Sequence, residues 1–328
     1  MIAGSLRDDS WLRSALRCPI CRSLLDDGDG GLRCANRSVR HVFPVTDGVP
    51  ILINETNSAF SIAEVIARAG GGQAGPATLR IAHRILPSFH RVGTKRANYA
   101  KMTSLLLART SNPKVLVVGA GDVGLGIEPL LARCPPLRVI ESDVSVGSRT
   151  QLVCDAHDLP FADETYDGVV VQAVLEHVLD PQRCVAEIHR VLAPEGLVYA
   201  ETPFMQQVHA GPFDFTRFTH LGHRRLFRYF DEITSGTGQG PGTALAWAYQ
   251  YFALCFATSR RARALIRAFT QVTSFWLKYF DAYLGRKPGV FDASSGYFFL
   301  GTKAETPLSD RDLIAGYRGA LRSPGCEP

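Results

Sequence analysis

The sequence has no apolar run long enough to cross a bilayer. The nearly uncharged stretch TALAWAYQYFALCFAT, residues 243–258, has 16 residues, whereas a membrane-spanning helix needs roughly 20. The first residues, MIAGSLRDDSWLRSALRC, contain acidic side chains and lack the apolar core of a secretory signal. These absences exclude a transmembrane helix and a signal peptide, and they favour a cytoplasmic protein.

Other signals of special classes are also missing. The sequence has no internal repeat and no low-complexity tract, and its eight cysteines are scattered over 328 residues, so structural disulfides are not expected. The net charge is +5, but only SRRARALIR, residues 259–267, is densely basic, so nucleic-acid binding is permitted rather than indicated. With 46% hydrophobic residues the chain can build a sizeable core, and its length suggests two modules.

A glycine-rich loop follows an apolar strand at VLVVGAGDVGLG, residues 115–126. Gly119, Gly121 and Gly124 fit the spacing G-x-G-x-x-G, and the apolar segment IEPLLARC after them predicts a helix. Glycines at these positions let the backbone and a helix N-terminus approach a nucleotide. The pattern alone leaves two interpretations open, a nucleotide-type ligand and an ordinary turn.

A second apolar strand, LRVIESDVS, carries Glu141 and Asp143 at its carboxyl end, about 20 residues past the glycines. A carboxylate there can accept hydrogen bonds from both hydroxyls of a ribose. The alternative is a helix cap or a solvated strand end, because Asp followed closely by Ser also suits a turn. Dinucleotides and S-adenosylmethionine both contain a ribose, so these signals do not separate an oxidoreductase from a methyltransferase.

The next segment separates them. From residue 153 to residue 204, VCDAHDLPFADETYDGVVVQAVLEHVLDPQRCVAEIHRVLAPEGLVYAETPF resembles the class I S-adenosylmethionine-dependent methyltransferases that have a D-a-x-x-L-P-F motif. The resemblance implies an α/β fold, a Rossmann-like sheet with helices on both faces. It also implies a cofactor site. The residues that it assigns to S-adenosylmethionine are Gly119, Ala120, Gly121, Asp143, Asp155, Ala156 and Gln172.

Two features depart from that family. An acidic residue often precedes the first glycine, and this chain has Val118 there, which keeps a non-catalytic binding partner as an alternative. Only VSVGSRTQ lies between Asp143 and the third strand, whereas a crossover helix between parallel strands needs a dozen residues or more. We therefore expect a shortened flank of the sheet, either open to solvent or covered by another segment.

The N-terminal stretch has the spacing of metal ligands. Cys18 and Cys21 form a C-x2-C pair, and Cys34 follows a polar, glycine-rich hairpin. Together with FPVTDGVPILI, this stretch resembles the zinc-ribbon-like domain of the activator subunit of tRNA and release-factor methyltransferases. The resemblance makes His41 the fourth ligand of Zn²⁺, because Arg37 occupies the position of a second C-x2-C cysteine. A metal-free ribbon held by its apolar residues is the alternative.

Composition divides the chain into modules. The glycine-rich ARAGGGQAGP marks a boundary, and the segments ATLRIAHRIL and KRANYAKMTSLLLART predict capping helices. SGYFFLGTKA suits the seventh strand of the sheet. The predicted organisation is a zinc-ribbon-like β module (1–57), a linker with a capping helix (58–95), the methyltransferase domain (96–305) with a helical insertion (242–288), and a tail (306–328).

Candidate acceptor residues follow the fifth strand, in TPFMQQVHAGPFDFTRFTHLGHRRLFRYF. Ligands collect at the carboxyl ends of parallel strands, and this segment concentrates groups that hold or orient protons. His209 is the first candidate for a base, Asp214 would orient it, and His220 is the third catalytic candidate. The alternative is structural: these histidines cap loops, and Asp214 pairs locally with Arg217.

The pattern as a whole predicts a methyltransferase that uses S-adenosylmethionine on a small-molecule acceptor, such as a sugar or a lipid-linked metabolite. A ribosomal or transfer RNA methyltransferase is the first alternative, because the ribbon could contact RNA. A nicotinamide enzyme rests on the glycines alone. The apolar helix and its basic neighbours, residues 243–263, suit a lid, a dimer surface or a peripheral contact with anionic lipid.

Overall fold

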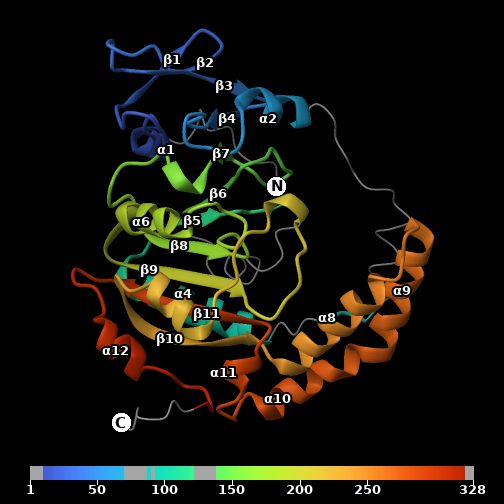
Figure 1. Cartoon of the computed structure of the whole chain (residues 1–328). Coiled ribbons are helices and arrows are strands. Elements are labelled where there is room, and N and C mark those ends of the chain that lie inside the picture. Colours follow the sequence, from blue (N-terminus) through green and yellow to red (C-terminus); the bar gives the residue numbers. More distant parts are fainter. Residues whose placement is uncertain (1–9, 70–86, 90–92, 122–137, 322–328) are drawn as a thin grey trace.

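The computed structural model describes residues 10–69, 87–89, 93–121 and 138–321 (Figure 1). Gly124, the helix expected after the glycine loop and the helix expected over residues 77–86 lie outside these ranges. The described strands form one sheet in the order β1-β2-β3-β4-β7-β6-β5-β8-β9-β11-β10.

Seven strands form the central part of this sheet. They are β5 (Lys114–Val118), β6 (Arg138–Asp143), β7 (Leu152–Cys154), β8 (Tyr166–Gln172), β9 (Leu192–Pro203), β10 (Phe230–Gln239) and β11 (Gly296–Lys303). The first five run parallel to one another, and β11 is antiparallel to both β9 and β10. Parallel strands read as continuous apolar runs because both faces are covered. The predicted α/β fold class, a Rossmann-like sheet, is confirmed.

Helices cover the sheet on both faces. On one face, Tyr99, Met102 and Leu106 of α4 (Gly93–Arg109) pack with residues of the central strands. On the other face, α6 (Pro181–Val191) buries its apolar side in the larger core cluster. This helix begins where Asp180 accepts a hydrogen bond from the amide of Arg183, with a proline at its first turn. The short helix α7 (His220–Leu226) follows the acceptor-side loop, residues 204–219, which carries acceptor residues expected from the sequence.

The N-terminal module continues the central sheet. It contains α1 (Ser10–Ala15), β1 (Leu25–Gly28), β2 (Gly31–Cys34), β3 (Val42–Thr46), β4 (Val49–Leu52) and α2 (Ile62–Ala69). Antiparallel pairing joins β1 to β4 in sequence, with an Asp47-Gly48 turn in the left-handed region between β3 and β4. Strand β4 then pairs in parallel with β7, with Ile51 opposite Val153. The module is thus an extension of the sheet.

The flank beside β7 is covered by this module. Within the described part of the chain, residues 144–151 form no helix between β6 and β7. In place of a crossover helix, Val65 of α2 packs with Ile51, Ile53 and Val153 in a cluster of its own. Of the two outcomes expected for the short connection, the covered flank is the one observed.

Helices lie between β10 and β11. They are α8 (Pro241–Leu254), α9 (Arg260–Ser274), the 3₁₀ helix η4 (Phe275–Tyr279), α10 (Phe280–Leu284) and α11 (Val290–Ala293). The buried Asp281 of α10 ties this insertion together, because its carboxylate accepts hydrogen bonds from the Gly242 amide and the Thr243 hydroxyl, both at 2.7 Å. The last described helix is α12 (Asp310–Ala315). None of the described helices is long and apolar enough to span a membrane.

Candidate cofactor and acceptor site

The glycine loop after β5 is held against the end of β6. Gly119 has a φ of +74° and Gly121 a φ of +61°, which side chains disfavour. The amides of Gly119 and Ala120 donate to the Ser142 carbonyl oxygen at 2.9 and 3.0 Å. The Gly121 amide donates to Asp143 Oδ2 at 2.9 Å. The loop and the carboxylate that sequence analysis paired are therefore in direct contact.

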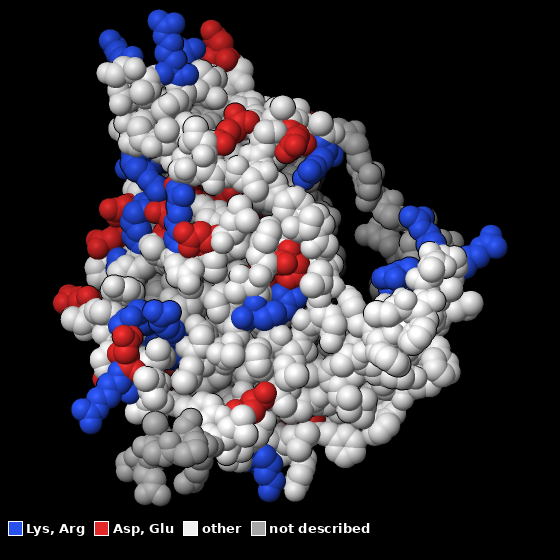
Figure 2. Space-filling view, viewed as in Figure 1, with Lys and Arg blue, Asp and Glu red and all other residues white. Residues whose placement is uncertain are grey.

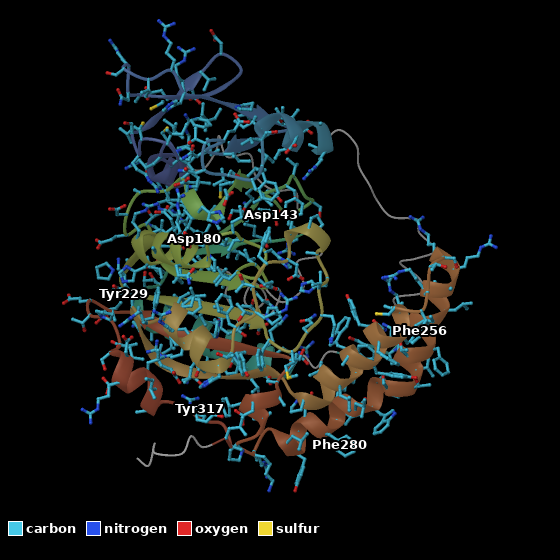
Figure 3. The ribbon with its side chains drawn as sticks, viewed as in Figure 1. Asp143, Asp180, Tyr229, Phe256, Phe280 and Tyr317 are labelled. Carbon is cyan, nitrogen blue, oxygen red and sulfur yellow. The ribbon has the colours of Figure 1, made fainter. Side chains whose placement is uncertain are left out.

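A cavity of about 390 Å³ opens at the carboxyl ends of β5, β6 and β7. Of the residues that the sequence assigned to the cofactor, five line it: Gly119, Gly121, Asp143, Asp155 and Ala156. Figure 3 labels Asp143 in this region. Ala120 is a buried residue of the loop and is not in the lining. The volume is in the range of small-molecule sites.

The two acidic residues of β6 have different partners. Glu141 is nearly buried and forms a bidentate pair with Arg149, in which Nη2 lies 2.7 Å from Oε1. Asp143 Oδ1 accepts hydrogen bonds from the amide and hydroxyl of Ser145 at 3.0 and 2.9 Å. Asp143 thus shapes a turn, the alternative that its sequence left open, and it also lines the cavity.

Asp155 is a buried carboxylate in the cavity wall. It accepts hydrogen bonds from the His157 amide at 3.0 Å and the Ser58 hydroxyl at 2.5 Å. Burial opposes ionisation, but the hydrogen bonds from His157 and Ser58 outweigh it and lower the pKa of Asp155. His157 is held in turn by the Asp180 amide, which donates to its Nε2 at 3.0 Å. The carboxylate is thus ionised and fixed.

The N-terminal module contributes to the same cavity, which sequence reasoning missed. Ala59, Phe60 and Arg68 belong to its lining. The ring of Phe60 stacks on that of Phe213, with centroids 5.4 Å apart and planes inclined by 22°. Since Phe213 follows β9, the cavity is closed by two segments that lie far apart in the sequence. The β4–β7 pairing and the hydrogen bond from Ser58 to Asp155, which no local pattern encodes, hold the first of these segments at the cavity.

A second cavity, of about 190 Å³, lies beside the first and shares Ala173 with it. Its lining comes from α4, from the ends of β8 to β11 and from the loop after β9, and it includes these residues with polar side chains: Lys95, Gln172, Glu176, Glu201, Thr202, Gln206, His209, Gln239, Ser295 and Tyr297. Gln172 donates to Glu201 at 2.8 Å and accepts from the Tyr99 hydroxyl at 3.0 Å. The structure places Gln172 in the wall of this cavity and not among the residues that line the first.

Glu176, His177 and His209 converge where the two cavities meet. Glu176 Oε1 lies 3.6 Å from His177 Nε2 and 3.9 Å from His209 Nε2. Burial raises the pKa of Glu176 to about 7. The rings of the two histidines are 4.8 Å apart, edge to face. His177, which lines the first cavity, and Glu176 are site residues that sequence reasoning did not single out as functional.

Asp214 has both of the roles considered from the sequence. It forms a bidentate pair with Arg217, which lowers the pKa of the carboxyl well below its usual range. It also accepts a hydrogen bond from the His209 amide at 2.8 Å, and its Oδ2 lies 3.4 Å from His209 Nδ1. The ion pair holds the carboxylate in place beside the histidine ring.

His220, the third catalytic candidate, lies apart from this arrangement. It lies on α7 with its ring against Phe291 and Tyr297, at centroid distances of 4.8 and 5.6 Å. It lines neither cavity. Burial lowers the pKa of His220 to about 4, so the ring is neutral at pH 7. Its place behind Tyr297 is that of a packed core histidine.

The four predicted zinc ligands lie together in the N-terminal module. Their ligand atoms are all within 4.8 Å of one another: Cys18, Cys21, Cys34 and His41. Cys21 Sγ is 3.3 Å from Cys34 Sγ, and Cys18 Sγ is 3.4 Å from His41 Nδ1. A tetrahedral zinc ion with Zn–S bonds of about 2.3 Å places its sulfur ligands roughly 3.8 Å apart. The observed cluster fits such an ion after a small outward shift.

Comparisons with known proteins agree with this geometry. Residues 116–200 match the family model described as a methyltransferase domain. A segment of 44 residues is 48% identical to the ubiquinone/menaquinone biosynthesis C-methyltransferase UbiE of Desulfotalea psychrophila, and it covers 13% of this chain and 18% of that protein. The similarity to a methyltransferase domain thus extends over residues 116–200, and the curated relative is matched over less than a fifth of its length.

Solved structures resemble the chain at low identity. Phosphoethanolamine N-methyltransferase 2 of Haemonchus contortus is 14% identical, with a TM-score of 0.41 over 64% of this chain and 53% of that one. A chain in the complex of the Haloferax volcanii Trm112 methyltransferase activator with a methyltransferase is 18% identical, with a TM-score of 0.37 over 65% and 93%. The fold is defined by the strand order of the sheet and not by these likenesses.

Proposed function

We propose that this chain transfers the methyl group of S-adenosylmethionine to a small-molecule acceptor. The observation that carries the proposal is the pair of adjoining cavities: one lined by the glycine loop, Asp143 and Asp155, the other polar and meeting it at Ala173. When bound, the cofactor supplies a sulfonium-activated methyl group. Asp143 would hold the ribose hydroxyls and Asp155 would lie beside the adenine. The remaining task, alignment of the acceptor with the methyl group, falls to the second cavity.

The second cavity suits an acceptor with hydroxyl groups. Gln172, Gln206 and Thr202 offer hydrogen-bond donors and acceptors, and Lys95 adds a positive charge. His209 is the group best placed to take a proton from such an acceptor, because it lines the cavity and Asp214 lies 3.4 Å behind its Nδ1. A sugar or another polar metabolite fits these side chains.

We further infer that the N-terminal cluster of Cys18, Cys21, Cys34 and His41 binds one structural Zn²⁺. The support is the four-ligand geometry, together with the small size of the β1–β4 hairpins, which leaves them little core of their own. Metal analysis of protein purified without chelator should find one zinc per chain from this cluster. A zinc content near zero would leave a ribbon held by its apolar side chains alone.

The helical insertion suits contact with an anionic lipid surface, which would present a lipid-linked acceptor. Residues 241–288 contain seven basic residues and one acidic residue, the buried Asp281. Large apolar side chains are exposed on it, including Phe252 at 66% and Phe256 at 74%. In Figure 2 its visible surface is largely uncharged, with Lys and Arg at its far end, and Figure 3 places Phe256 and Phe280 on it. Aromatic and basic side chains together favour a membrane interface.

A third cavity, of about 490 Å³, connects this insertion with the acceptor-side loop. Gln206, Asp214, Phe215 and Arg217 line it from the loop, and Tyr251 lines it from α8. Gln206 belongs to the second cavity as well, and Phe215 belongs to the first. An acceptor that arrives along α8 would therefore reach the point where the cofactor and acceptor cavities meet.

Titration calorimetry with S-adenosylmethionine tests the cofactor part of the proposal. Replacement of Asp143 by alanine should weaken binding by about 1 to 3 kcal/mol, the cost of leaving the ribose hydroxyls unpaired. Glu141→Gln is the matched control, because Glu141 belongs to the same strand but pairs with Arg149. Tight NADH binding without S-adenosylmethionine binding would refute the assignment, and failure to bind either would favour a non-catalytic partner.

The acceptor is tested with labelled S-adenosylmethionine and fractionated cell extract. Label in the lipid or small-molecule fraction supports the proposal. Label in RNA would favour the RNA methyltransferase instead, although on the face shown in Figure 2 basic and acidic side chains alternate between the ribbon and the sheet.

Sedimentation with vesicles tests the lipid contact. The double substitution Phe252→Ser/Phe256→Ser should abolish binding to phosphatidylglycerol vesicles, while Ile314→Ser, exposed on α12, should not. A dimer disrupted by the same double substitution, without vesicle binding, would assign the surface to a second copy.

A further inference from the structure

The junction of the two cavities combines three potential metal ligands from two segments. Glu176 and His177 follow β8, whereas His209 lies in the loop after β9. One ligand atom from each residue can be chosen so that all three lie within 4.8 Å of one another. Two imidazoles and one carboxylate thus lie close together, and the proposed methyl transfer uses His209 but gives no role to Glu176 or His177.

The carboxylate of this group lacks a partner. The Glu176 side chain is 1% exposed, and neither of its oxygens has a hydrogen-bond partner among the described residues. The histidine nitrogens at 3.6 and 3.9 Å are beyond hydrogen-bond distance. A buried polar group without a partner is costly, so native proteins rarely retain one without a ligand or a role. The unpaired carboxylate therefore points to a missing cation.

Both imidazoles are oriented from behind, as metal-binding histidines are. His177 Nδ1 lies 2.7 Å from the Phe213 carbonyl oxygen, so it donates its proton there and leaves the Nε2 lone pair toward Glu176. His209 Nδ1 lies 3.3 Å from the Gln207 carbonyl oxygen and 3.4 Å from Asp214 Oδ2, which favours the same tautomer. Outer hydrogen bonds of this kind fix the ring and the tautomer of a ligand.

The backbone holds the two segments in register. The amides of Phe215 and Thr216 donate to the Glu176 carbonyl oxygen at 2.8 and 3.2 Å. The loop that carries His209 is therefore attached to the segment that carries Glu176 and His177. Such a site needs little rearrangement when a ligand binds.

We propose that Glu176, His177 and His209 bind a divalent first-row transition metal ion, of the class of Mn²⁺, Fe²⁺ or Zn²⁺. Imidazole with carboxylate suits these ions, whereas Ca²⁺ and Mg²⁺ prefer oxygen ligands alone. Metal–ligand bonds of about 2.0 to 2.2 Å place ligand atoms roughly 3.0 to 3.6 Å apart. The distances of 3.6 and 3.9 Å from Glu176 need only a slight contraction. Three protein ligands leave coordination positions for a small molecule.

The role of this ion rests on the proposed methyl transfer. An acceptor hydroxyl bound to the cation loses its proton to solvent more readily, because the positive charge stabilises the oxyanion. The oxygen then forms the new C–O bond while the C–S bond of the sulfonium breaks, and the electron pair of that bond stays on sulfur. With the ion bound, His209 is a metal ligand and no longer the base. The cation then promotes the loss of the proton from the acceptor hydroxyl.

Mn²⁺ binding to the full-length protein loaded with a single equivalent of zinc tests the site, because the thiolates of the ribbon take up that zinc and have little affinity for Mn²⁺. The loss of the free-ion electron paramagnetic resonance signal measures binding. Wild-type protein should bind one Mn²⁺, and E176Q and H209N should each weaken it at least tenfold. H189N is the matched control, since His189 is half-buried and bonds the Ala304 carbonyl oxygen instead. If E176Q fails to fold, H209N, in a partly exposed loop, still decides the question.

Two results would overturn the inference: a wild-type protein that binds no Mn²⁺, or variants that bind it as tightly as the wild type. Calorimetry with S-adenosylmethionine on the same samples separates this inference from the proposed function. Both variants should keep their cofactor affinity within about twofold, because Asp143 and the glycine loop are untouched. Mn²⁺ binding without S-adenosylmethionine binding would refute the methyl transfer and leave the metal site standing.

Discussion

Alanine at Gly119 should destabilise the fold far more than alanine at Gly121, although both glycines belong to one loop. Both have positive φ, and that conformation costs an L-residue about 1 to 2 kcal/mol. Their surroundings differ. A Cβ at Gly119 would lie 2.2 Å from Val174 Cγ2, whereas one at Gly121 would have no atom of the described residues within 4 Å. Because the χ1 angle of valine is stiff, the overlap adds about 1 to 3 kcal/mol.

Urea unfolding followed by circular dichroism measures the difference. We expect the free energy of unfolding to fall by about 2 to 5 kcal/mol for Gly119→Ala, which has both the conformational cost and the overlap with Val174. For Gly121→Ala, which has the conformational cost alone, we expect a fall of about 1 to 2 kcal/mol. The double variant Gly119→Ala/Val174→Ala should recover about 1 kcal/mol or more relative to additivity, because it removes the overlapping methyl group. Equal stability of the two single variants would refute the view that close packing on Val174 is what requires glycine at position 119.

Three further predictions concern the N-terminal module. Phe60→Leu should weaken S-adenosylmethionine binding about two- to tenfold in calorimetry, because it removes the stacked ring from the cavity wall; unchanged affinity would place Phe60 outside the occupied part. Ile51→Ala should cost about 2 to 5 kcal/mol in urea unfolding, since this fully buried side chain fills the cluster between β4 and α2; a loss below 1 kcal/mol would mean that the flank is not packed. Cys34→Ser should lower both the zinc content and the melting temperature, and an unchanged metal content would exclude Cys34 as a ligand.

The sequence was sufficient to predict those features whose determinants are local. The apolar runs and their loops predict the strands, and a carboxylate at a strand end must lie beside the loops of neighbouring parallel strands. Asp143 and the glycine loop meet for that reason, 22 residues apart in the chain. The short connection after Asp143 likewise excluded a crossover helix on length alone.

Features that depend on long-range pairing were not predictable in this way. The four residues of β4 read as the end of a separate ribbon, yet their pairing with β7 brings Phe60 to the wall of the first cavity. Gln172 ends its strand on the side of the second cavity, and His220 turns into the core, because helix α7 presents that face to Tyr297. Residue type suggested chemistry at each position, but the direction of a side chain follows from packing.

Packing also decides the pKa of His223, a histidine whose residue type alone would suggest a role in proton transfer. It is 2% exposed, it packs edge to face on Phe227 at 5.2 Å, and its Nε2 has no hydrogen-bond partner among the described residues. Burial lowers the pKa of His223 from 6.5 to about 3. Between pH 6.5 and pH 3 this histidine is protonated in the unfolded chain and neutral in the folded chain. The free energy of unfolding therefore falls as the pH falls through this range, by at most about 1.4 kcal/mol per pH unit. When the pH is lowered from 6 to 4.5, the free energy of unfolding of His223→Leu, measured with urea, should therefore fall by about 1 to 2 kcal/mol less than that of the wild type. Identical pH dependence in the two proteins would mean that the ring is solvated in the folded state, contrary to its packing on Phe227.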